Sequence, residues 1–564
     1  MKPRKVLIID GYNDEPGGLG VPPYIDVYPR YIAGALWYGD KSIKIRYTTV
    51  DDFRTSKNWL VKANSYDMVV FISGVVVPGK YIGAAPVTYE ELIEWVRIIR
   101  DPYKVLVGPA AKWGLGVSGG VKAHSPKEFR RAGFDVVVVG DVEEYFLDVA
   151  KYGVEKASPY KTRSDYRLVD KVSVIGSRII RQHPNYGRNL IVEIETYRGC
   201  SRWVSSGCSF CVEPLRGMPI SRDPKAIVEE IDALYYWGAR SFRLGRQADI
   251  LVYGSRTLGY EEWPKPDPVA LNRLFHGIRS VAPNLETLHI DNVNPGTIAR
   301  YPSESIEALK VIIKYHTPGD VAAMGLETAD PRVSKINNLN TYPEESLEAI
   351  RIINRVGSRR GYNGMPELLP GINFILGLPG ETKETYRLNK EFLENVLREG
   401  LLVRRVNIRR IMIIPTTRAS RMGAGIRRRH EHLARAFTRW VRQVFDREML
   451  KRIAPRGTIL RGLWVEECNT TYCYARQTGS YPLMTLIPCR MPKGTYIKDA
   501  YIIGVHSPRT VKAIPIPLSP KNSVRILSKI FGSNKANGLK GRDRGDLVSF
   551  EDAPIVSDNG YLCL

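Results

Sequence analysis

The sequence has few cysteines and no long apolar run. Seven cysteines among 564 residues are too few for a disulfide-stapled scaffold. No segment approaches the roughly 18–20 consecutive apolar residues that a membrane-spanning helix needs. The first residues, MKPRKVLIIDGYNDEPGG, lead into an apolar strand and an acidic, glycine-rich turn without a cleavable apolar segment. We therefore expect a cytoplasmic protein with no membrane partner.

Acidic residues are too few to balance the basic ones. The chain has 83 Lys and Arg against 59 Asp and Glu, which gives a net charge of +24. Such an excess favours a polyanionic partner, RNA or DNA. The alternative is a generally basic cytoplasmic proteome such as that of a thermophile, and charge alone favours nucleic acid only slightly.

The chain is too long for a single core, and its apolar pattern predicts several domains. Continuous apolar runs ending in turns predict buried parallel strands at residues 5–12, 67–76, 103–111 and 134–145. Amphipathic stretches such as 89–100 lie between the last three and predict helices. This pattern predicts a doubly wound parallel sheet, a Rossmann-like α/β domain, over 1–150. Residues 151–188 are polar and irregular, which is typical of a linker.

A second series of strands and helices begins at residue 189. Its strand segments are NLIVEIETYRG, SFRLGRQAD, TLHIDNVNP, VAAMGLETAD, GINFILGLPGET and RRVNIRRIMIIP. They predict a partial (β/α)6 barrel over 189–453, with its chemistry at the carboxyl ends of the strands. The barrel ends in one long amphipathic helix, 430–453, whose expected apolar stripe is Leu433, Phe437, Trp440, Val441 and Val444.

Short strands separated by Gly and Pro predict a small β domain over 456–518. Residues 519–564 then contain a helix–turn–helix pattern at 522–538 and a polar tail.

Three cysteines, Cys200, Cys208 and Cys211, lie close together just after a predicted barrel strand, with seven and then two residues between them. Three thiolates on one loop are a ligand set for a four-iron cluster that keeps one iron open. A zinc site would normally include a fourth Cys or His, and the closest histidine, His183, precedes the strand. Buried structural cysteines do not suit a turn rich in Gly, Ser and Arg. The pattern favours the cluster over both alternatives.

Residues 189–415, which contain these cysteines, resemble the radical S-adenosylmethionine (SAM) superfamily, in its elongator/methylthiotransferase-like branch. Phe210, just before the last cysteine, matches the superfamily pattern. The segments LGRQAD, GLETADPRV and GINFILGLPGET follow in the order in which that branch places its SAM-contacting elements. One departure is the spacing of the first two cysteines: the usual gap is three residues, so RWVSSG must loop out.

The resemblance implies a 4Fe-4S cluster on Cys200, Cys208 and Cys211 that, with one electron from a donor such as ferredoxin or flavodoxin, cleaves SAM to a 5′-deoxyadenosyl radical. It also implies a set of SAM-binding residues: Phe210, Gly245, Arg246, Gln247, Glu327, Gly377 and Gly380. Glu381 fits equally well as the cap of the following helix. Candidate substrate contacts at the end of a barrel strand are His289, Asp291 and Asn292.

The whole chain resembles a largely archaeal subfamily of uncharacterised Fe–S oxidoreductases. That subfamily has a cobalamin-binding-like N-terminal domain and C-terminal nucleic-acid-binding-like modules. Here the loop after the first strand, IDGYNDEPGGLG, lacks the histidine that ligates cobalt, although GDVEEYF (140–146) resembles a cobalamin-binding turn. Cobalamin binding therefore stays open, and we favour a degenerate domain used for substrate docking. The absence of cysteine from this domain argues against a methylthiotransferase of the known kind.

Basic segments suggest RNA, and tRNA in particular, as the substrate. RRVNIRR (404–410), RASRMGAGIRRRH (418–430) and the arginines of the long helix, Arg435, Arg439 and Arg442, would neutralise phosphates. ARQTGSYPLMTLIP resembles a small RNA-binding barrel, and KIFGSNKANG resembles a helix–hairpin–helix turn.

Two alternatives remain for the function, and one for the remaining cysteines. The chain could be a radical SAM methylase or oxidoreductase acting on a small molecule or protein, with cobalamin, or a non-catalytic cluster protein, which is disfavoured. Cys468, Cys473 and Cys489 could hold a second cluster, but their spacing favours ordinary β-domain cysteines.

Overall fold

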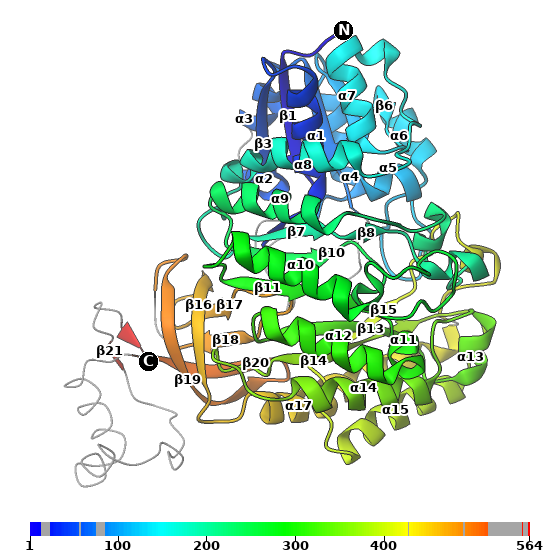
Figure 1. Cartoon of the computed structure of the whole chain (residues 1–564), viewed down its shortest axis with the longest axis vertical. Coiled ribbons are helices and arrows are strands. Elements are labelled where there is room, and N and C mark those ends of the chain that lie inside the picture. Colours follow the sequence, from blue (N-terminus) through cyan, green and yellow to red (C-terminus); the bar gives the residue numbers. More distant parts are fainter. Residues whose placement is uncertain are drawn as a thin grey trace.

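The computed structural model describes residues 1–12, 23–55, 58–74, 85–426, 428–488 and 491–516, together with the short strands at 555–556 and 562–563. Figure 1 shows an N-terminal α/β unit at the top, a larger α/β unit in the middle and a small β barrel beside the latter. No helix in the described part of the chain is long and apolar enough to cross a membrane.

The N-terminal sheet has five parallel strands in the order β3-β1-β4-β5-β6. The strands are β1 (Lys5–Asp10), β3 (Lys44–Thr49), β4 (Met68–Ile72), β5 (Tyr103–Val107) and β6 (Val136–Val137). The helices are α1 (Val27–Gly39), α2 (Val50–Thr55), α3 (Asn58–Ala63), α4 (Tyr89–Ile98), α5 (Pro109–Trp113), α6 (Pro126–Ala132) and α7 (Val142–Tyr152). This order is one of the common doubly wound arrangements, so the predicted fold class is confirmed. The prediction missed β3, an edge strand whose KIRYTT sequence has no continuous apolar run.

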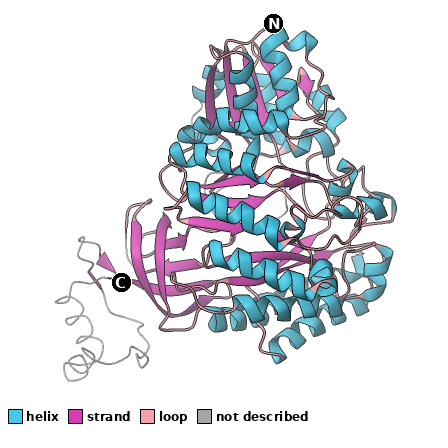
Figure 2. Ribbon diagram, in the orientation of Figure 1, coloured by secondary structure: helices cyan, strands magenta, loops and turns pink. Residues whose placement is uncertain are grey.

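The central unit is built from two four-stranded sheets, β11-β10-β7-β2 and β12-β13-β14-β15. They meet at Asp291, the single residue between β11 (Thr287–Ile290) and β12 (Asn292–Val293). The other strands are β7 (Ile191–Glu195), β10 (Ser241–Gly245), β13 (Asp320–Glu327), β14 (Leu368–Leu376) and β15 (Arg405–Arg410). All six predicted strand segments of the partial barrel are present, and Figure 2 shows helices along the outer side of these strands.

Helices connect the barrel strands: α9 (Pro224–Tyr236), α10 (Pro268–Val281), α11 (Pro295–Arg300), α12 (Pro302–Tyr315), α13 (Pro331–Ile336), α14 (Pro343–Gly357) and α15 (Lys383–Arg398).

One edge strand comes from far away in the sequence. β2 (Tyr24–Ile25) precedes the helices of the N-terminal domain, yet it pairs in parallel with β7. Two residues carry no strand signal of their own, so only tertiary pairing reveals this edge.

The expected linker is not irregular. Residues 151–188 contain α8 (Arg167–Gly176) and the 3-10 segment η2 (Ser177–Gln182). Gly34 of α1 lies so close to α8 that an added Cβ atom would come within 1.9 Å of the Val172 carbonyl oxygen. The prediction was wrong because it took the charged residues of 151–188 as typical of the whole segment, whereas the apolar residues of α8 recur at helical intervals.

The long helix after the barrel contains a π turn. It consists of α16 (Glu431–Trp440), the π segment η8 (Val441–Phe445) and α17 (Asp446–Ile453). The wider turn shifts the buried face so that Phe445 is buried and Val444 is 46% exposed. Val444 was therefore wrongly assigned to the apolar stripe, because a regular 3.6-residue period does not include this shift.

The C-terminal strands form a closed barrel in the order β16-β17-β18-β20-β19. They are β16 (Ile459–Cys468), β17 (Cys473–Gln477), β18 (Met484–Ile487), β19 (Tyr496–Ser507) and β20 (Thr510–Ile516). Every contact between neighbouring strands is antiparallel except that of β18 with β20. The expected small β region is confirmed, although β17 and β20 were not among the predicted strands.

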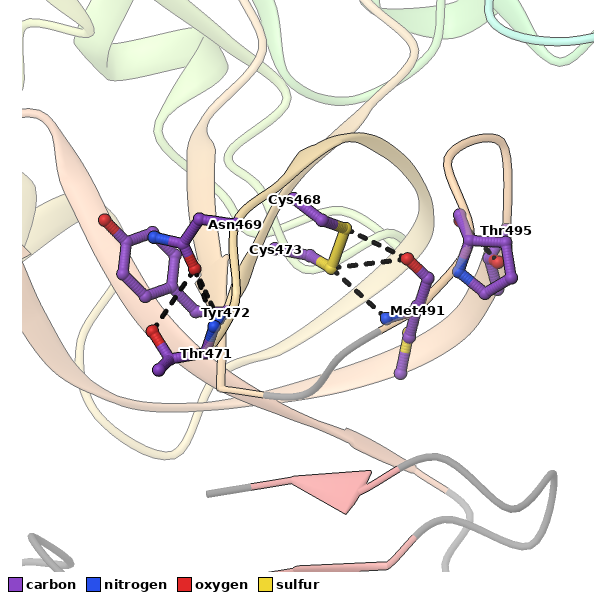
Figure 3. The surroundings of a disulfide bond; sticks show 8 residues. Cys468, Asn469, Thr471, Tyr472, Cys473, Met491 and Thr495 are labelled. Atoms are coloured by element: carbon purple, nitrogen blue, oxygen red, sulfur yellow. Dashed lines mark hydrogen bonds between the residues drawn. A yellow bond between two sulfur atoms is a disulfide. The ribbon is translucent and has the colours of Figure 1, made fainter.

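A disulfide joins Cys468 of β16 to Cys473 of β17, which face each other in the strand register (Figure 3). Neither sulfur is then a free thiolate, so the idea of a second cluster on these two residues is wrong. Cys489 and the helix–turn–helix pattern at 522–538 lie outside the described residues.

Candidate active site

The three cysteines lie on the loop that follows the first barrel strand. After β7 the chain forms β8 (Tyr197–Arg198), passes Cys200, forms the 3-10 segment η3 (Ser201–Ser205) and reaches Cys208 and Cys211. All three thiols are free and partly buried. Burial raises the pKa of Cys200 to about 12 and raises those of Cys208 and Cys211. Cys208 further raises the pKa of Cys200, and both raise that of Cys211, as expected for neighbouring thiols.

The long gap between the first two cysteines forms a firmly held turn. Arg202 is buried, with its Nε 2.9 Å from Glu262 Oε1 and its Nη1 3.2 Å from the Cys208 sulfur. Asn338 donates from Nδ2 to the backbone carbonyls of Ser205 and Gly207, both at 2.9 Å. The insertion is therefore wound into η3 and anchored, which answers how Cys200 and Cys208 reach one site.

These residues fit an iron–sulfur cluster. Each thiolate of such a cluster binds a different iron, so the sulfurs need not close on one ion; the described residues hold no group of His, Cys, Asp and Glu arranged around a single metal. Apolar side chains, including those of Phe210, Ile375 and Ile411, pack beside Cys208. The buried Arg202 guanidinium offsets the negative charge of bound thiolates.

Two buried side-chain oxygens at the carboxyl ends of barrel strands have no hydrogen-bond partner among the described residues. They are Oε2 of Glu327, at the end of β13, and Oε1 of Gln247, just after β10. Glu327 lies near enough to raise the pKa of Cys208, and burial raises its own pKa to about 8, opposed by Arg409. A buried orphan acceptor is costly, so these atoms suit a ligand with N–H or O–H donors such as SAM.

The backbone at these positions is tightly constrained. Glu327 and Arg246 both adopt a left-handed conformation, with φ of 63° and 64°. An added Cβ atom at Gly245 would lie 1.9 Å from Glu193 Oε1, so that position requires glycine. Strained residues cluster at functional sites, and here they lie at the carboxyl ends of β10 and β13.

Arg246 is directed at the N-terminal segment. Its Nη1 lies 3.2 Å from Asp26 Oδ2, and its Nη2 donates to the Tyr28 hydroxyl at 3.1 Å. Together with Arg198 and Arg216 it lines a cavity of about 20 Å³, room for one or two water molecules, between the N-terminal domain and the barrel. Sequence reasoning missed Asp26, which no motif marks.

GDVEEYF (140–146) borders the same cavity. Asp141 caps α7, and the buried Glu143 lies 2.9 Å from Arg163, whose Nη1 reaches Glu195 at 2.8 Å. These ion pairs connect the N-terminal domain to the first barrel strand.

Gly377 and Gly380 make the turn after β14, with φ of 94° and 91°. Glu381 holds that turn: its Oε1 accepts from the N–H groups of Gly377 and Leu378, and its Oε2 accepts from the Tyr386 hydroxyl at 3.0 Å. Glu381 is thus engaged within the protein. The role of the two glycines, like that of Phe210, Gly245, Arg246, Gln247 and Glu327 towards SAM, stays a prediction.

The three candidate substrate contacts separate into different surroundings. His289 is buried; its Nδ1 accepts from the Ser480 N–H at 3.0 Å, and its Nε2 lies 3.1 Å from the Thr317 carbonyl. Asn292 donates to the Gln247 carbonyl at 3.2 Å, and Asp291 lies between the two sheets. His289 therefore joins the barrel to the small β domain, whereas Asn292 adjoins Gln247.

Residues 194–393 match the family model described as the Radical SAM superfamily. The chain is 44% identical over 485 residues to "Uncharacterized protein MJ0274" of Methanocaldococcus jannaschii, covering 85% of this chain and 88% of that one.

More distant relatives include a ribosomal protein uS12 methylthiotransferase RimO of Thermodesulfovibrio yellowstonii, 26% identical over 36% of this chain and 41% of that protein. A tRNA-2-methylthio-N(6)-dimethylallyladenosine synthase of Buchnera aphidicola is 25% identical, over 38% and 44%. Among solved structures, the radical SAM methyltransferase TsrM of Kitasatospora setae covers 83% of this chain and 79% of its own, at 15% identity and a TM-score of 0.47.

This chain belongs to the radical SAM superfamily. It is accordingly an enzyme that uses a 4Fe-4S cluster and SAM, as its three-cysteine loop and barrel predicted.

Proposed function

We propose that this enzyme modifies RNA, with tRNA as its substrate class. The observation that carries the proposal is a set of exposed arginines on the segment after β15 and on helix α16, which follows it: Arg421, Arg428, Arg429 and Arg439. Within the described residues no carboxylate forms an ion pair with any of the four. The segment that begins this set touches the loop, because Ala419 N–H donates to the Ser209 carbonyl at 2.9 Å.

Unpaired surface arginines are suited to phosphate. An RNA backbone laid across them would release counterions and gain affinity without any reading of its sequence. The neighbouring arginines differ: Arg410 and Arg435 both pair with Glu431, and Arg442 lies 2.6 Å from Asp446. The candidate phosphate-binding set is thus smaller than the sequence suggests, but the segment on which it begins contacts the cysteine loop through Ala419.

The small C-terminal barrel also supports RNA as the substrate. Five strands in which only the third and fifth are parallel form the arrangement of OB-type barrels, which commonly bind oligonucleotides. Among the distant relatives, one is named for tRNA and one for a ribosomal protein.

In this proposal the side chains of the protein bind the cluster, SAM and the RNA and orient them for reaction. When bound, the cluster and SAM supply a carbon radical that abstracts hydrogen. Cys200, Cys208 and Cys211 would hold the cluster, Gln247 and Glu327 offer acceptors to SAM, and the apolar wall at Phe210 excludes water. The exposed arginines would keep the RNA backbone outside while one nucleotide enters the barrel.

The decisive experiment compares modified nucleosides in total RNA from cells with and without the protein. We expect one modified nucleoside to disappear from tRNA and its precursor to accumulate. An unchanged set of nucleosides in every RNA class would refute the proposal.

A binding experiment tests the surface separately. Replacing Arg421, Arg428 and Arg429 by alanine should weaken tRNA binding and reduce the salt slope by about one for each lost phosphate contact. Arg167→Ala is the control, because Arg167 is also exposed but lies on α8 and pairs with Asp165.

A further inference from the structure

The loop between β17 and β18, residues 478–483, joins the small barrel to the radical SAM barrel. Ser480 N–H donates to His289 Nδ1 on β11 at 3.0 Å. Arg404, just before β15, donates to the Tyr481 carbonyl at 2.7 Å. The loop therefore contacts β11 of one sheet and the residue just before β15 of the other, and Tyr481 belongs to this loop.

The side chains of β15 alternate between two faces. Phe374 of β14, the register partner of Ile408, lies 5.5 Å from the ring of Phe437 on α16, so this face points outward to the helices. Arg405 and Arg409 lie on the opposite face, which is the barrel interior, because neighbouring strand residues point to opposite sides. Two guanidinium groups thus face the inside of the barrel.

Tyr481 lies among these charges. The Arg405 guanidinium stacks on its ring, with its central carbon 3.4 Å from the ring centroid. The Tyr481 hydroxyl is 3.4 Å from Asp291 Oδ1, and the charges of Arg243 and Arg409 also act on it. A residue of the C-terminal barrel therefore forms part of the interior surface of the radical SAM barrel.

The charges of this interior group do not balance. Arg243 is neutralised by Glu193, with 2.5 Å between Nε and Oε2. In the described part of the chain Arg405 has no ion pair, and its buried Nε has no hydrogen-bond partner. Burial lowers the pKa of Arg405, and Tyr481 and Asp291 only partly oppose this. A guanidinium inside the barrel without an ion pair destabilises the fold unless a ligand supplies the missing acceptor and negative charge.

We propose that Arg405, held flat by Tyr481, binds an anionic oxygen group of the substrate, a phosphate or carboxylate, inside the barrel. The planar fork of arginine suits two-point binding of such a group, and stacking fixes the orientation of that fork. The inference rests on the proposed function only in that a substrate enters the barrel. If the substrate is RNA, the anion belongs to the inserted nucleotide.

The test measures anion binding by the reconstituted full-length protein without RNA. Inorganic phosphate and succinate are titrated calorimetrically, so that a phosphate is compared with a carboxylate. Chloride keeps the ionic strength constant. We expect one of them to bind, and Arg405→Gln to weaken that binding about tenfold or more. Arg167→Gln, which removes an exposed arginine of α8, should leave it unchanged.

Further variants separate binding from folding. Arg405→Lys keeps the charge but not the fork, and should also bind more weakly. Tyr481→Ala should weaken binding, whereas Tyr481→Phe, which keeps the stacked ring, should bind as the native protein does. Each variant must keep the native unfolding midpoint. If Arg405→Gln does not, the proposal is tested by Arg405→Lys and by the comparison of Tyr481→Ala with Tyr481→Phe.

Three results would overturn the proposal. The first is that neither anion binds the native protein. The second is that Arg405→Gln, correctly folded, binds as tightly as native. The third is that Arg405→Gln weakens SAM binding by the same factor, which would assign the anion to the SAM carboxylate. An unchanged nucleoside profile would refute the RNA proposal alone and leave this one standing.

Discussion

Arg202 should set the reduction potential of the cluster. Its guanidinium is 2% exposed and points Nη1 at the Cys208 sulfur from 3.2 Å. A buried cation and N–H donor at a ligating sulfur stabilise the reduced cluster, which carries one more negative charge. Arg202→Gln removes the charge and leaves a shorter, neutral amide, so the midpoint potential should fall.

The size of the shift follows from the contact. Hydrogen bonds to charged groups contribute about 1.5–3 kcal/mol, and part of this is present in both oxidation states. Glu262, at 2.9 Å from Arg202 Nε, shares the charge and reduces it further. A differential effect of about 1.4 kcal/mol corresponds to about 59 mV for a one-electron couple. We therefore expect a midpoint about 60 mV lower.

The assay is a redox titration of reconstituted protein followed by electron paramagnetic resonance, after iron content shows that the cluster is loaded. Arg300→Gln is the matched control, because Arg300 lies over the same Trp263 ring as Arg202 but donates to the Gly296 carbonyl and not to a cysteine sulfur of the loop. A shift no larger than that of the control, or a shift upward, would contradict the reasoning. Arg202→Lys should give an intermediate value.

Three further predictions concern the cluster, the pH dependence and the helix register. Cys208→Ala should lose the cluster, whereas Cys473→Ala, which only opens the disulfide, should keep native iron and sulfide content per chain. Burial raises the pKa of Asp10 from 3.8 to about 7, so the folded protein holds a proton that the unfolded chain releases, and stability should fall as pH rises from about 4 to about 7. Asp10→Asn should reduce that slope by up to one proton in urea unfolding at a series of pH values; an unchanged slope would exclude this carboxyl as its source. Phe445→Ala should cost about 3–5 kcal/mol of unfolding free energy and Val444→Ala less than about 1 kcal/mol, and equal costs would argue against the π turn.

The strands that carry the site were predictable because they are locally encoded. Buried parallel strands need continuous apolar runs, and the segments around Ile194, Leu244, Ile290 and Ile372 have them. The cysteine loop was equally predictable from the sequence, since its three thiols lie within twelve residues of one another. The linker helix and the π turn were not, because each depends on packing that a regular period does not reveal.

By itself, the sequence determined the parallel sheets, the cysteine ligand set and the superfamily, since each rests on residues that are neighbours along the chain. Only the tertiary structure decided that β2 completes a barrel edge, that Arg202 donates to a cysteine sulfur, and that Tyr481 stacks on Arg405 inside the barrel. The partners β2 and β7, like Tyr481 and Arg405, lie far apart in the sequence. Such contacts arise only when separate elements pack together, and no local pattern of residues records which surfaces will meet.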